Sequence, residues 1–256
     1  PCYSQPKLDG IRCTTNNNGM WSRKNKLFVG VPHIFSALKV AREKYGIITD
    51  GELYCDKFAN DFNAICSIVK KKKPTADDLR VSEESMQYWI YDICDTKKPF
   101  SERIKIVQDI VNEIDIPFIK AVPTVLIKNQ EQLDEYYASY IEHGFEGQMI
   151  RADTRYEFRR TRSLLKRKEF IEEEYVIIGI TEGVGNLTGY AATAEFQNEL
   201  GYQFSAAFIG DRAFWKRILQ DQDNLIGKLA TVRFFNKTPD KQIPRFPKVK
   251  AIRDYE

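Results

Sequence analysis

The sequence predicts an α+β protein that is divided into two domains. Strand-like segments alternate with a few helical ones through the larger, N-terminal part of the 256 residues. After Lys168 the composition changes abruptly, because the next six residues, EFIEEE, include four acids. Short strands with turn residues between them follow. We therefore expect one domain of residues 1–170, a second of residues 171–256, and a hinge formed by the acidic stretch.

The first domain combines helical and extended patterns. Apolar residues recur with helical periodicity over residues 31–45 and 131–143. Ser101 has the side chain of an N-cap, which predicts a helix from there to about Glu113. Buried strands are expected where apolar side chains dominate, at residues 88–93 and 147–151.

The second domain has the pattern of a small β-barrel. The strand-like segments YVIIGITEG, GYAATAEFQ and GYQFSAAFIG are followed by a helix from Asp211 to about Gln220 and then by LATVRFF. About five strands with one helix before the fourth fit a Greek-key barrel of the OB type.

Composition excludes several kinds of protein. Apolar residues make up 43% of the chain, yet no apolar run approaches the roughly 20 residues that a membrane span needs, so no membrane partner is expected. Only His33 and His143 are present, which excludes a histidine-rich metal site and argues against a histidine-based catalytic triad. The five cysteines are scattered without a C-x-x-C pair, which indicates a reducing, intracellular compartment.

Basic residues are distributed unevenly, although the net charge is only +3. Residues 155–168, RYEFRRTRSLLKRK, contain seven basic residues and one acid. This run predicts a strand with basic edges, suited to facing phosphates. Four consecutive lysines at residues 70–73 are more typical of a solvated loop.

The segment from Lys7 to Arg12, KLDGIR, has residues suited to nucleophilic catalysis. A lysine at the end of a strand can act as a nucleophile. Asp9 can orient the amine or a substrate hydroxyl, and Gly10 lets the backbone turn close to a ligand. Arg12 supplies a fixed cation. Taken alone, the segment fits an ordinary turn after a strand equally well.

Three other segments supply charged groups that polyphosphate chemistry needs. Glu52 lies in DGEL after a strand-like stretch, and Glu146 opens the strand EGQMIR. Lys166 and Lys168 alternate at the end of another strand, which places both on one face. Two carboxylates, a nucleophilic lysine and two further lysines form a coherent site for a polyphosphate and a metal ion.

As a set, these segments resemble the motifs of the covalent nucleotidyltransferases, and most closely those of the ATP-dependent DNA ligases of small viruses and phages. The matching motifs, in chain order, are Lys7 to Arg12 (motif I), Ser22-Arg23 (Ia), Asp50 to Leu53 (III), Tyr91-Asp92 (IIIa), Glu146 to Arg151 (IV), Leu165 to Lys168 (V) and Pro244 to Arg253 (VI). The resemblance covers nearly the whole chain. It implies an ATP-grasp-like adenylation (nucleotidyltransferase) domain of antiparallel sheets with helices, followed by the OB-fold barrel.

The resemblance also implies an activity, the sealing of nicks between a 3′-hydroxyl and a 5′-phosphate in duplex DNA. Lys7 would attack the α-phosphate of ATP to form lysyl-AMP, with Asp9 as a second catalytic residue. AMP would then pass to the 5′-phosphate, from which the 3′-hydroxyl would displace it. The cofactors would be ATP and Mg²⁺, for which Mn²⁺ could substitute. We expect an intracellular monomer, encoded by a virus or phage, that serves DNA replication, repair or recombination.

The same resemblance assigns the remaining site residues. Contacts to ATP or AMP are expected from Gln5, Lys7, Arg12, Glu52, Tyr91, Glu146, Lys166, Lys168 and Arg253. Glu52 and Glu146 would hold the metal ion. Contacts to DNA are expected from Ser22, Arg23, Arg159 and Arg160.

Two features depart from the family pattern. Motif VI usually reads Arg, any residue, Asp, Lys, but here Arg253 is followed directly by Asp254. The arginine carries over, whereas the residues after it depart from the register of the motif. Only six residues precede Lys7, which indicates a trimmed or renumbered chain.

Other functions remain open from sequence. An mRNA-capping guanylyltransferase shares motif I but typically has Asp-Gly in motif IV, where this chain has Glu146-Gly147. RNA ligases of this superfamily usually lack an OB tail with a motif VI. A non-enzymatic OB protein with a degenerate transferase domain is a third possibility, against which the intact lysines and glutamates of the motifs argue.

Overall fold

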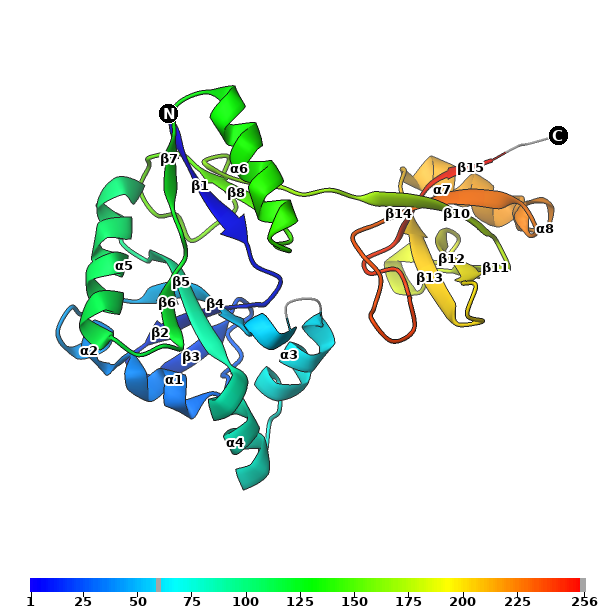
Figure 1. Ribbon diagram of the computed structural model, residues 1–256. Helices are drawn as coiled ribbons and strands as arrows, with labels where there is room; N and C mark the ends of the chain where they lie inside the picture. Colours follow the sequence, from blue (N-terminus) through cyan, green and yellow to red (C-terminus); the bar gives the residue numbers. More distant parts are fainter. Residues whose placement is uncertain (59–60, 254–256) are drawn as a thin grey trace. The chain divides into compact units, whose positions relative to one another are not determined.

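The structure is a computed structural model that describes residues 1–58 and 61–253. The chain divides into two compact units, Pro1–Lys168 and Glu169–Glu256, each of which is described by itself (Figure 1). Asp254, which follows Arg253 at the end of motif VI, lies outside the described residues.

The first unit contains two β-sheets. One has the strand order β3 (Gly19–Ser22), β2 (Ile11–Asn16), β4 (Thr49–Tyr54), β5 (Gln87–Ile93) and β6 (Ile119–Ala121). The other has the order β7 (Val125–Ile127), β1 (Cys2–Lys7), β8 (Gly147–Arg151) and β9 (Leu164–Arg167). The pairing of β5 with β6 is parallel, and the other pairings are antiparallel. Motifs Ia, III and IIIa lie on the first of these sheets and motifs IV and V on or next to the second, while motif I runs from β1 of one sheet to β2 of the other.

Helices accompany both sheets. Their bounds are α1 Pro32–Ala37, α2 Lys39–Glu43, α3 Phe62–Val69, α4 Ala76–Ser85, α5 Phe100–Ile114 and α6 Gln130–Glu142. The long α5 contacts β5 and β6 of the first sheet, while α6 contacts β1, β7 and β8 of the second (Figure 1). No described helix is both long and apolar enough to cross a membrane.

The helix ends differ from expectation in two places. The segment 31–45 forms two short helices that meet at Leu38 instead of one. The predicted cap at Ser101 is wrong, because α5 begins at Phe100 with Pro99 as its N-cap. Proline favours the entry to a helix since its φ is fixed. The backbone N–H of Ser101 is instead capped by the Asp153 carboxylate at 2.8 Å, a partner distant in sequence.

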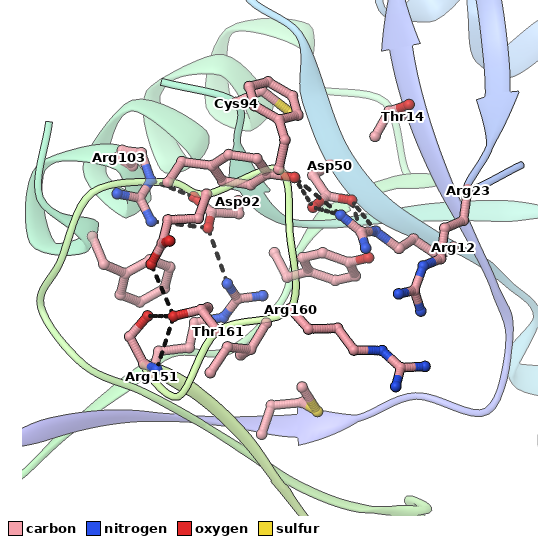
Figure 2. Close-up of a pocket in the computed structure, with 18 of the residues that line it drawn as sticks. Arg12, Thr14, Arg23, Asp50, Asp92, Cys94, Arg103, Arg151, Arg160 and Thr161 are labelled. Carbon is pink, nitrogen blue, oxygen red and sulfur yellow. Dashed lines mark hydrogen bonds and ion pairs between the residues drawn. The ribbon is translucent and has the colours of Figure 1, made fainter. Parts of the chain in front are cut away.

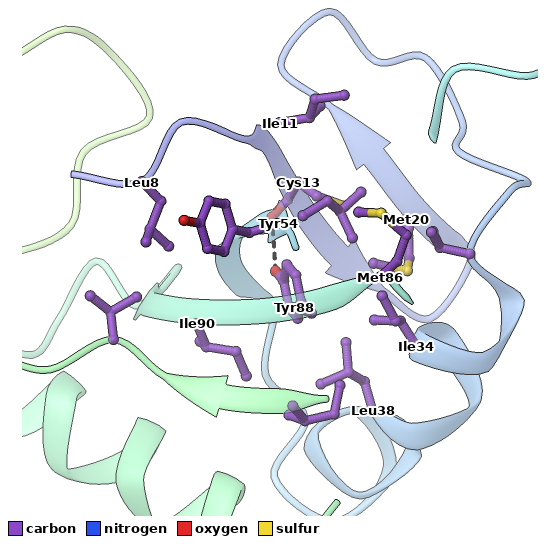
Figure 3. Packing of buried hydrophobic residues seen from close by; sticks show 14 of the residues in the cluster. Leu8, Ile11, Cys13, Met20, Ile34, Leu38, Tyr54, Met86, Tyr88 and Ile90 are labelled. Atoms are coloured by element: carbon purple, nitrogen blue, oxygen red, sulfur yellow. Dashed lines mark hydrogen bonds between the residues drawn. The ribbon is translucent and has the colours of Figure 1, made fainter. Parts of the chain in front are cut away.

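Strand alternation in the first sheet separates the core from a polar face. Tyr88 and Ile90 of β5 are fully buried, together with Leu53 of β4, in the hydrophobic cluster shown in Figure 3. The Tyr88 hydroxyl donates a hydrogen bond of 2.8 Å to the Cys13 carbonyl. Successive strand residues point to opposite faces of a sheet. Because Leu53 points into the core, the adjacent Glu52 points to the opposite face.

The second unit is built on a six-stranded sheet. Its strand order is β10 (Ile171–Val176), β14 (Leu229–Phe234), β15 (Lys248–Ile252), β13 (Gln203–Phe208), β12 (Ala191–Gln197) and β11 (Gly179–Glu182). The helices α7 (Arg212–Gln220) and α8 (Gln222–Leu225) precede β14. A separate core contains Phe196, Phe204 and Phe234. The two strands at the ends of this order, β10 and β11, are consecutive in the chain.

The acidic stretch predicted as a hinge lies largely within a strand. Residues 171–174 belong to β10, where each acid has a basic partner on the same unit. Glu172 pairs with Arg233 and Lys250, both at 2.7 Å, and Glu174 contacts Arg253 at 3.1 Å. The acids of this strand therefore neutralise basic residues of the second unit instead of forming a solvated linker.

The basic run 155–168 is a loop for most of its length, with only residues 164–167 in β9. The strand expected over the whole run does not form, because its polar side chains bond locally. Glu157 accepts hydrogen bonds from Arg159 and Thr161, both at 2.8 Å. Such local side-chain bonding competes with a strand ladder.

Substitution of Gly147 tests how closely the backbones of β8 and β9 approach each other. Its φ is +153°, and an added Cβ would lie 2.2 Å from the Arg167 carbonyl oxygen. We expect Gly147→Ala to lower the free energy of unfolding by roughly 2 kcal/mol or more, since both strain and a backbone clash oppose it. Urea unfolding followed by tryptophan fluorescence measures the loss. The matched control is Gly144→Ala, which has a φ of +79° but nothing within 4 Å. Equal losses in the two variants would contradict this account.

Candidate active site

A cavity of about 950 Å³ lies in the first unit, lined by residues of both sheets and of the loop 152–163. Ten residues assigned from sequence line it, namely Gln5, Lys7, Arg12, Ser22, Arg23, Glu52, Tyr91, Arg159, Arg160 and Lys166. Glu146 and Lys168 are not in the lining. Glu146 contacts Lys7, and Lys168 contacts Glu146. Asp9 and Arg253 lie elsewhere.

Lys7, Glu146 and Lys168 meet where three neighbouring strands end or begin. Lys7 pairs with Gly147 in the β1–β8 register, and the Glu146 N–H donates to the Lys7 carbonyl at 2.9 Å. The Glu146 carboxylate accepts from the Lys7 ammonium through one oxygen. It accepts from the Lys168 ammonium through the other, at 3.0 Å. A nearly buried carboxylate, 8% exposed, is thus neutralised by two lysines.

Glu52 enters the site from the other sheet. An added Cβ on Gly10 would lie 2.4 Å from the Leu53 carbonyl oxygen and 2.8 Å from Glu52 Cγ. Glycine therefore lets the turn after Lys7 pack directly against β4. Burial raises the Glu52 pKa to about 8, with the negative charges of Asp50 and Glu146 adding to the rise and Lys7 and Arg12 opposing it.

The Asp50 carboxylate binds three polar side chains at one wall of the cavity. It accepts from Arg12 at 2.9 and 2.8 Å, from the Tyr91 hydroxyl at 3.1 Å and from the Tyr156 hydroxyl at 2.7 Å. Burial alone would lower the Arg12 pKa, but its hydrogen bonds and ion pair with Asp50 raise it. The guanidinium expected to contact ATP or AMP is therefore bound to Asp50 in this structure.

The buried Asp92 carboxylate also links the two sheets. Arg103 of α5 contacts it at 2.7 and 3.0 Å, and Arg151 of β8 at 2.9 Å. Arg151 also donates to the Gln5 side-chain oxygen at 2.7 Å. The Gln5 amide nitrogen donates in turn to the Tyr91 carbonyl and to Thr124. Gln5 thus links Arg151 to the Tyr91 carbonyl and to Thr124, and both ends of its amide are hydrogen-bonded to protein groups.

Cations gather at the cavity around the predicted DNA contacts. Figure 2 shows the guanidinium groups of Arg12, Arg23 and Arg160 on the same side of the cavity. The Lys166 ammonium is exposed and makes no hydrogen bond or ion pair with another described residue. Arg159 is 82% exposed and pairs with Glu157 of its own loop at 2.8 Å. The Ser22 hydroxyl accepts from the Lys26 N–H at 2.9 Å.

Two assigned residues lie outside the cavity wall. Asp9 lies in the turn between β1 and β2, where its charge adds to the effects of burial and Asp56 in raising the Tyr54 pKa to about 12. Arg253 belongs to the second unit, where it donates to the Thr231 hydroxyl at 2.7 Å and to Glu174 at 3.1 Å.

Sequence reasoning missed the structural parts played by Asp50, Tyr156, Arg103 and Arg151. Asp50 had a usable signal, because it lies two residues before Glu52 and so shares its strand face. Arg151 ends the EGQMIR segment, and strand alternation could have pointed it inward. Tyr156 and Arg103 carried no signal, since loop and helix partners distant in sequence are fixed only by tertiary structure.

Residues 1–168 match the protein-family model described as the ATP dependent DNA ligase domain. The chain belongs to this family. The membership predicted from the motif set is therefore confirmed, and the mixed α/β first unit has the fold of the ligase nucleotidyltransferase domain.

Individual relatives of this ligase-family chain are distant in sequence. The DNA ligase of African swine fever virus is 22% identical over 271 residues, which cover 94% of this chain and 60% of that protein. The chain thus spans about 60% of the length of this relative.

Solved structures agree in fold. A Lig E DNA ligase has a TM-score of 0.81 at 20% identity, covering 98% of this chain and 92% of that one. The Chlorella virus DNA ligase-adenylate has a TM-score of 0.53 at 27% identity, covering 100% and 93%.

The raised pKa of Glu52 predicts a pH-dependent gain in stability for Glu52→Gln. The folded protein holds the proton with a pKa of about 8, against 4.5 ordinarily, so the wild type loses stability as pH rises through that window. The variant should match the wild type near about pH 4 and exceed it in Tm by several degrees above about pH 8. Thermal melts across pH measure this, with the exposed Glu83→Gln as control. A Tm difference that does not change with pH would refute the account.

Proposed function

We propose that this chain seals nicks in duplex DNA with ATP, through an AMP adduct on Lys7 Nζ. The observation that carries the proposal is the meeting of Lys7 with Glu146 and Lys168 beside a cavity of about 950 Å³. The contact with the buried Glu146 carboxylate holds the Lys7 side chain at the cavity wall, where a nucleophile would meet a bound nucleotide. Family membership supports the same reaction class.

The reaction has three transfers at phosphorus. Lys7 Nζ attacks the α-phosphorus of ATP, and the bond to the bridging oxygen breaks to release pyrophosphate. An oxygen of the nick 5′-phosphate then attacks the same phosphorus, and the P–N bond to Lys7 breaks. Finally the 3′-hydroxyl attacks the 5′-phosphate, so that the phosphodiester forms and AMP leaves. Each transfer builds charge on phosphate oxygens, which fixed cations stabilise.

Individual side chains fit parts of this scheme. The exposed ammonium of Lys166 lines the cavity and would contact the transferring phosphate, as Lys168 would once released from Glu146. Arg12 and Glu52, partners in the β2–β4 register, would bind the ribose. Tyr91 would present its ring to adenine. Nη1 of Arg12 makes no hydrogen bond with another described residue, so it would donate to the ribose while Nε and Nη2 remain on Asp50.

The donor set suits a divalent ion that is shared with the substrate. No group of three or more His, Cys, Asp or Glu among the described residues is arranged to hold a metal ion. Glu52 and Glu146 both adjoin Lys7, and Mg²⁺ typically uses one or two carboxylates together with substrate phosphates and water. Bound there, Mg²⁺ or Mn²⁺ would neutralise phosphate charge and compete with Lys7 for the Glu146 carboxylate, which would release the Lys7 side chain toward the phosphate.

The second unit would act as an OB-fold clamp on the nicked duplex and supply Arg253 to the pyrophosphate of ATP. Support comes from its six-stranded sheet with β10 and β11 consecutive in the chain. Arg23, Arg159 and Arg160 of the first unit would contact the DNA backbone. Because such contacts release condensed counterions, nick affinity should fall steeply with salt.

Incubation with labelled ATP or GTP tests the reaction class directly. AMP uptake from ATP supports a ligase, whereas GMP uptake would indicate capping. Sealing of a nicked duplex whose flanking strands are DNA or RNA then separates a DNA ligase from an RNA ligase. Absence of both uptake and sealing would leave a non-enzymatic binding protein.

Lys7→Ala should abolish AMP uptake and the sealing of an ordinary nick, because no acceptor amine remains. Sealing of a nick that is already adenylated should persist, since that step does not use the lysine as an acceptor. The matched control is Lys39→Ala on the exposed face of α2, which should label normally. Covalent AMP on the Lys7→Ala protein would exclude Lys7 as the nucleophile.

Arg253→Ala should slow AMP uptake from ATP by about tenfold or more, since removal of one charge contact to the departing pyrophosphate costs transition-state stabilisation. Sealing of a pre-adenylated nick should change much less. Lys241→Ala in the same unit is the control. Undiminished AMP uptake by Arg253→Ala would remove the case for this residue in pyrophosphate handling.

A further inference from the structure

The loop 152–163, which joins β8 to β9, is held at its base by several tertiary hydrogen bonds. Asp153 accepts from the Ser101 N–H at 2.8 Å. The Thr154 carbonyl accepts from Arg103 at 2.7 Å. The Tyr156 hydroxyl donates to Asp50 at 2.7 Å. This loop is therefore fixed in position at the cavity wall, although it contains no regular element.

Beyond these anchors the loop presents an unusually exposed aromatic ring. Phe158 is 73% exposed, the most exposed of the large hydrophobic residues described in the first unit. Phe158 and Arg160 both line the cavity. The rings of Phe158 and Tyr156 form a T-shaped pair, with centroids 5.1 Å apart and an interplanar angle of 71°. Tyr156 thus supports the Phe158 ring.

The charges around Phe158 favour a phosphate-bearing partner. Glu157, the loop acid next to it, is neutralised by Arg159. Arg155, Arg160 and Arg162 form no ion pair with any residue that the structure describes. An aromatic ring beside cations is the combination by which proteins hold a nucleotide, with the ring on the base and the cations on phosphates.

We propose that Phe158 packs its ring against the nucleoside that carries the 5′-phosphate of the nick, while Arg160 contacts that phosphate. The inference rests on the proposed nick-sealing function and adds an aromatic contact to it. A nick interrupts the backbone, so the terminal nucleoside is the one that tilts away from its neighbour at least cost. Tyr156 and Arg12 both bond to Asp50. The Phe158 ring, which packs on Tyr156, therefore keeps a fixed position relative to the cavity wall where Arg12 would bind the nucleotide.

The test uses the full chain and a nicked duplex that is already adenylated at its 5′-phosphate. Phe158→Ala should raise the nick concentration needed for half-maximal sealing by about tenfold, in line with aromatic contacts to bases elsewhere. Phe158→Trp should retain wild-type affinity, whereas Phe158→Leu should behave like the alanine variant if the flat ring face matters. Leu126→Ala, which removes an exposed side chain from β7, is the control and should seal normally.

An abasic substrate identifies the contacted nucleoside. When the base on the 5′-phosphate side of the nick is removed, the wild type should lose the same factor, and Phe158→Ala should lose nothing further. Equal affinity of wild type and Phe158→Ala for the intact nick would overturn the inference, as would additive losses on the abasic nick. Failure of the wild type to take up AMP or seal any nick would instead overturn the proposed function.

Discussion

The site depends on one interaction, the pairing of the Glu146 carboxylate with the ammonium groups of Lys7 and Lys168. A carboxylate that is 8% exposed is costly to bury unless its charge is matched. The match requires the end of β1, the start of β8 and the end of β9 to meet at one place. The register of the four-stranded sheet and the positive φ of Gly147 provide that meeting.

The same principle connects the two sheets of the first unit. Asp92 lies on β5 of one sheet, and its partners Arg103 and Arg151 come from α5 and from β8 of the other. Asp50 likewise gathers Arg12 from β2 and Tyr156 from the loop 152–163. Removing one partner of such a buried network leaves an uncompensated charge, which is strongly destabilising. The walls of the cavity are therefore fixed by charge pairs before any substrate binds.

Several elements could be inferred from the residues alone, and others could not. The helix expected over residues 131–143 forms as α6, and the strands expected at 88–93 and 147–151 form as β5 and β8, because their apolar periodicity is local information. The basic run 155–168 was misjudged, since Glu157 and Tyr156 bind partners that draw most of it into a loop. The cap of α5 was misjudged because Asp153, distant in sequence, supplies it.

By itself the sequence determined the family and the motifs that bring Lys7, Glu52, Glu146 and Lys168 into one reaction scheme, because residue type and spacing carry that chemistry. Only the tertiary structure decided which charges touch. It assigned Lys7 to Glu146, Arg12 to Asp50 and Gln5 to Arg151. The reason is physical, since a buried charge takes the partner that strand register and packing place within hydrogen-bonding distance, and sequence separation gives no measure of that distance.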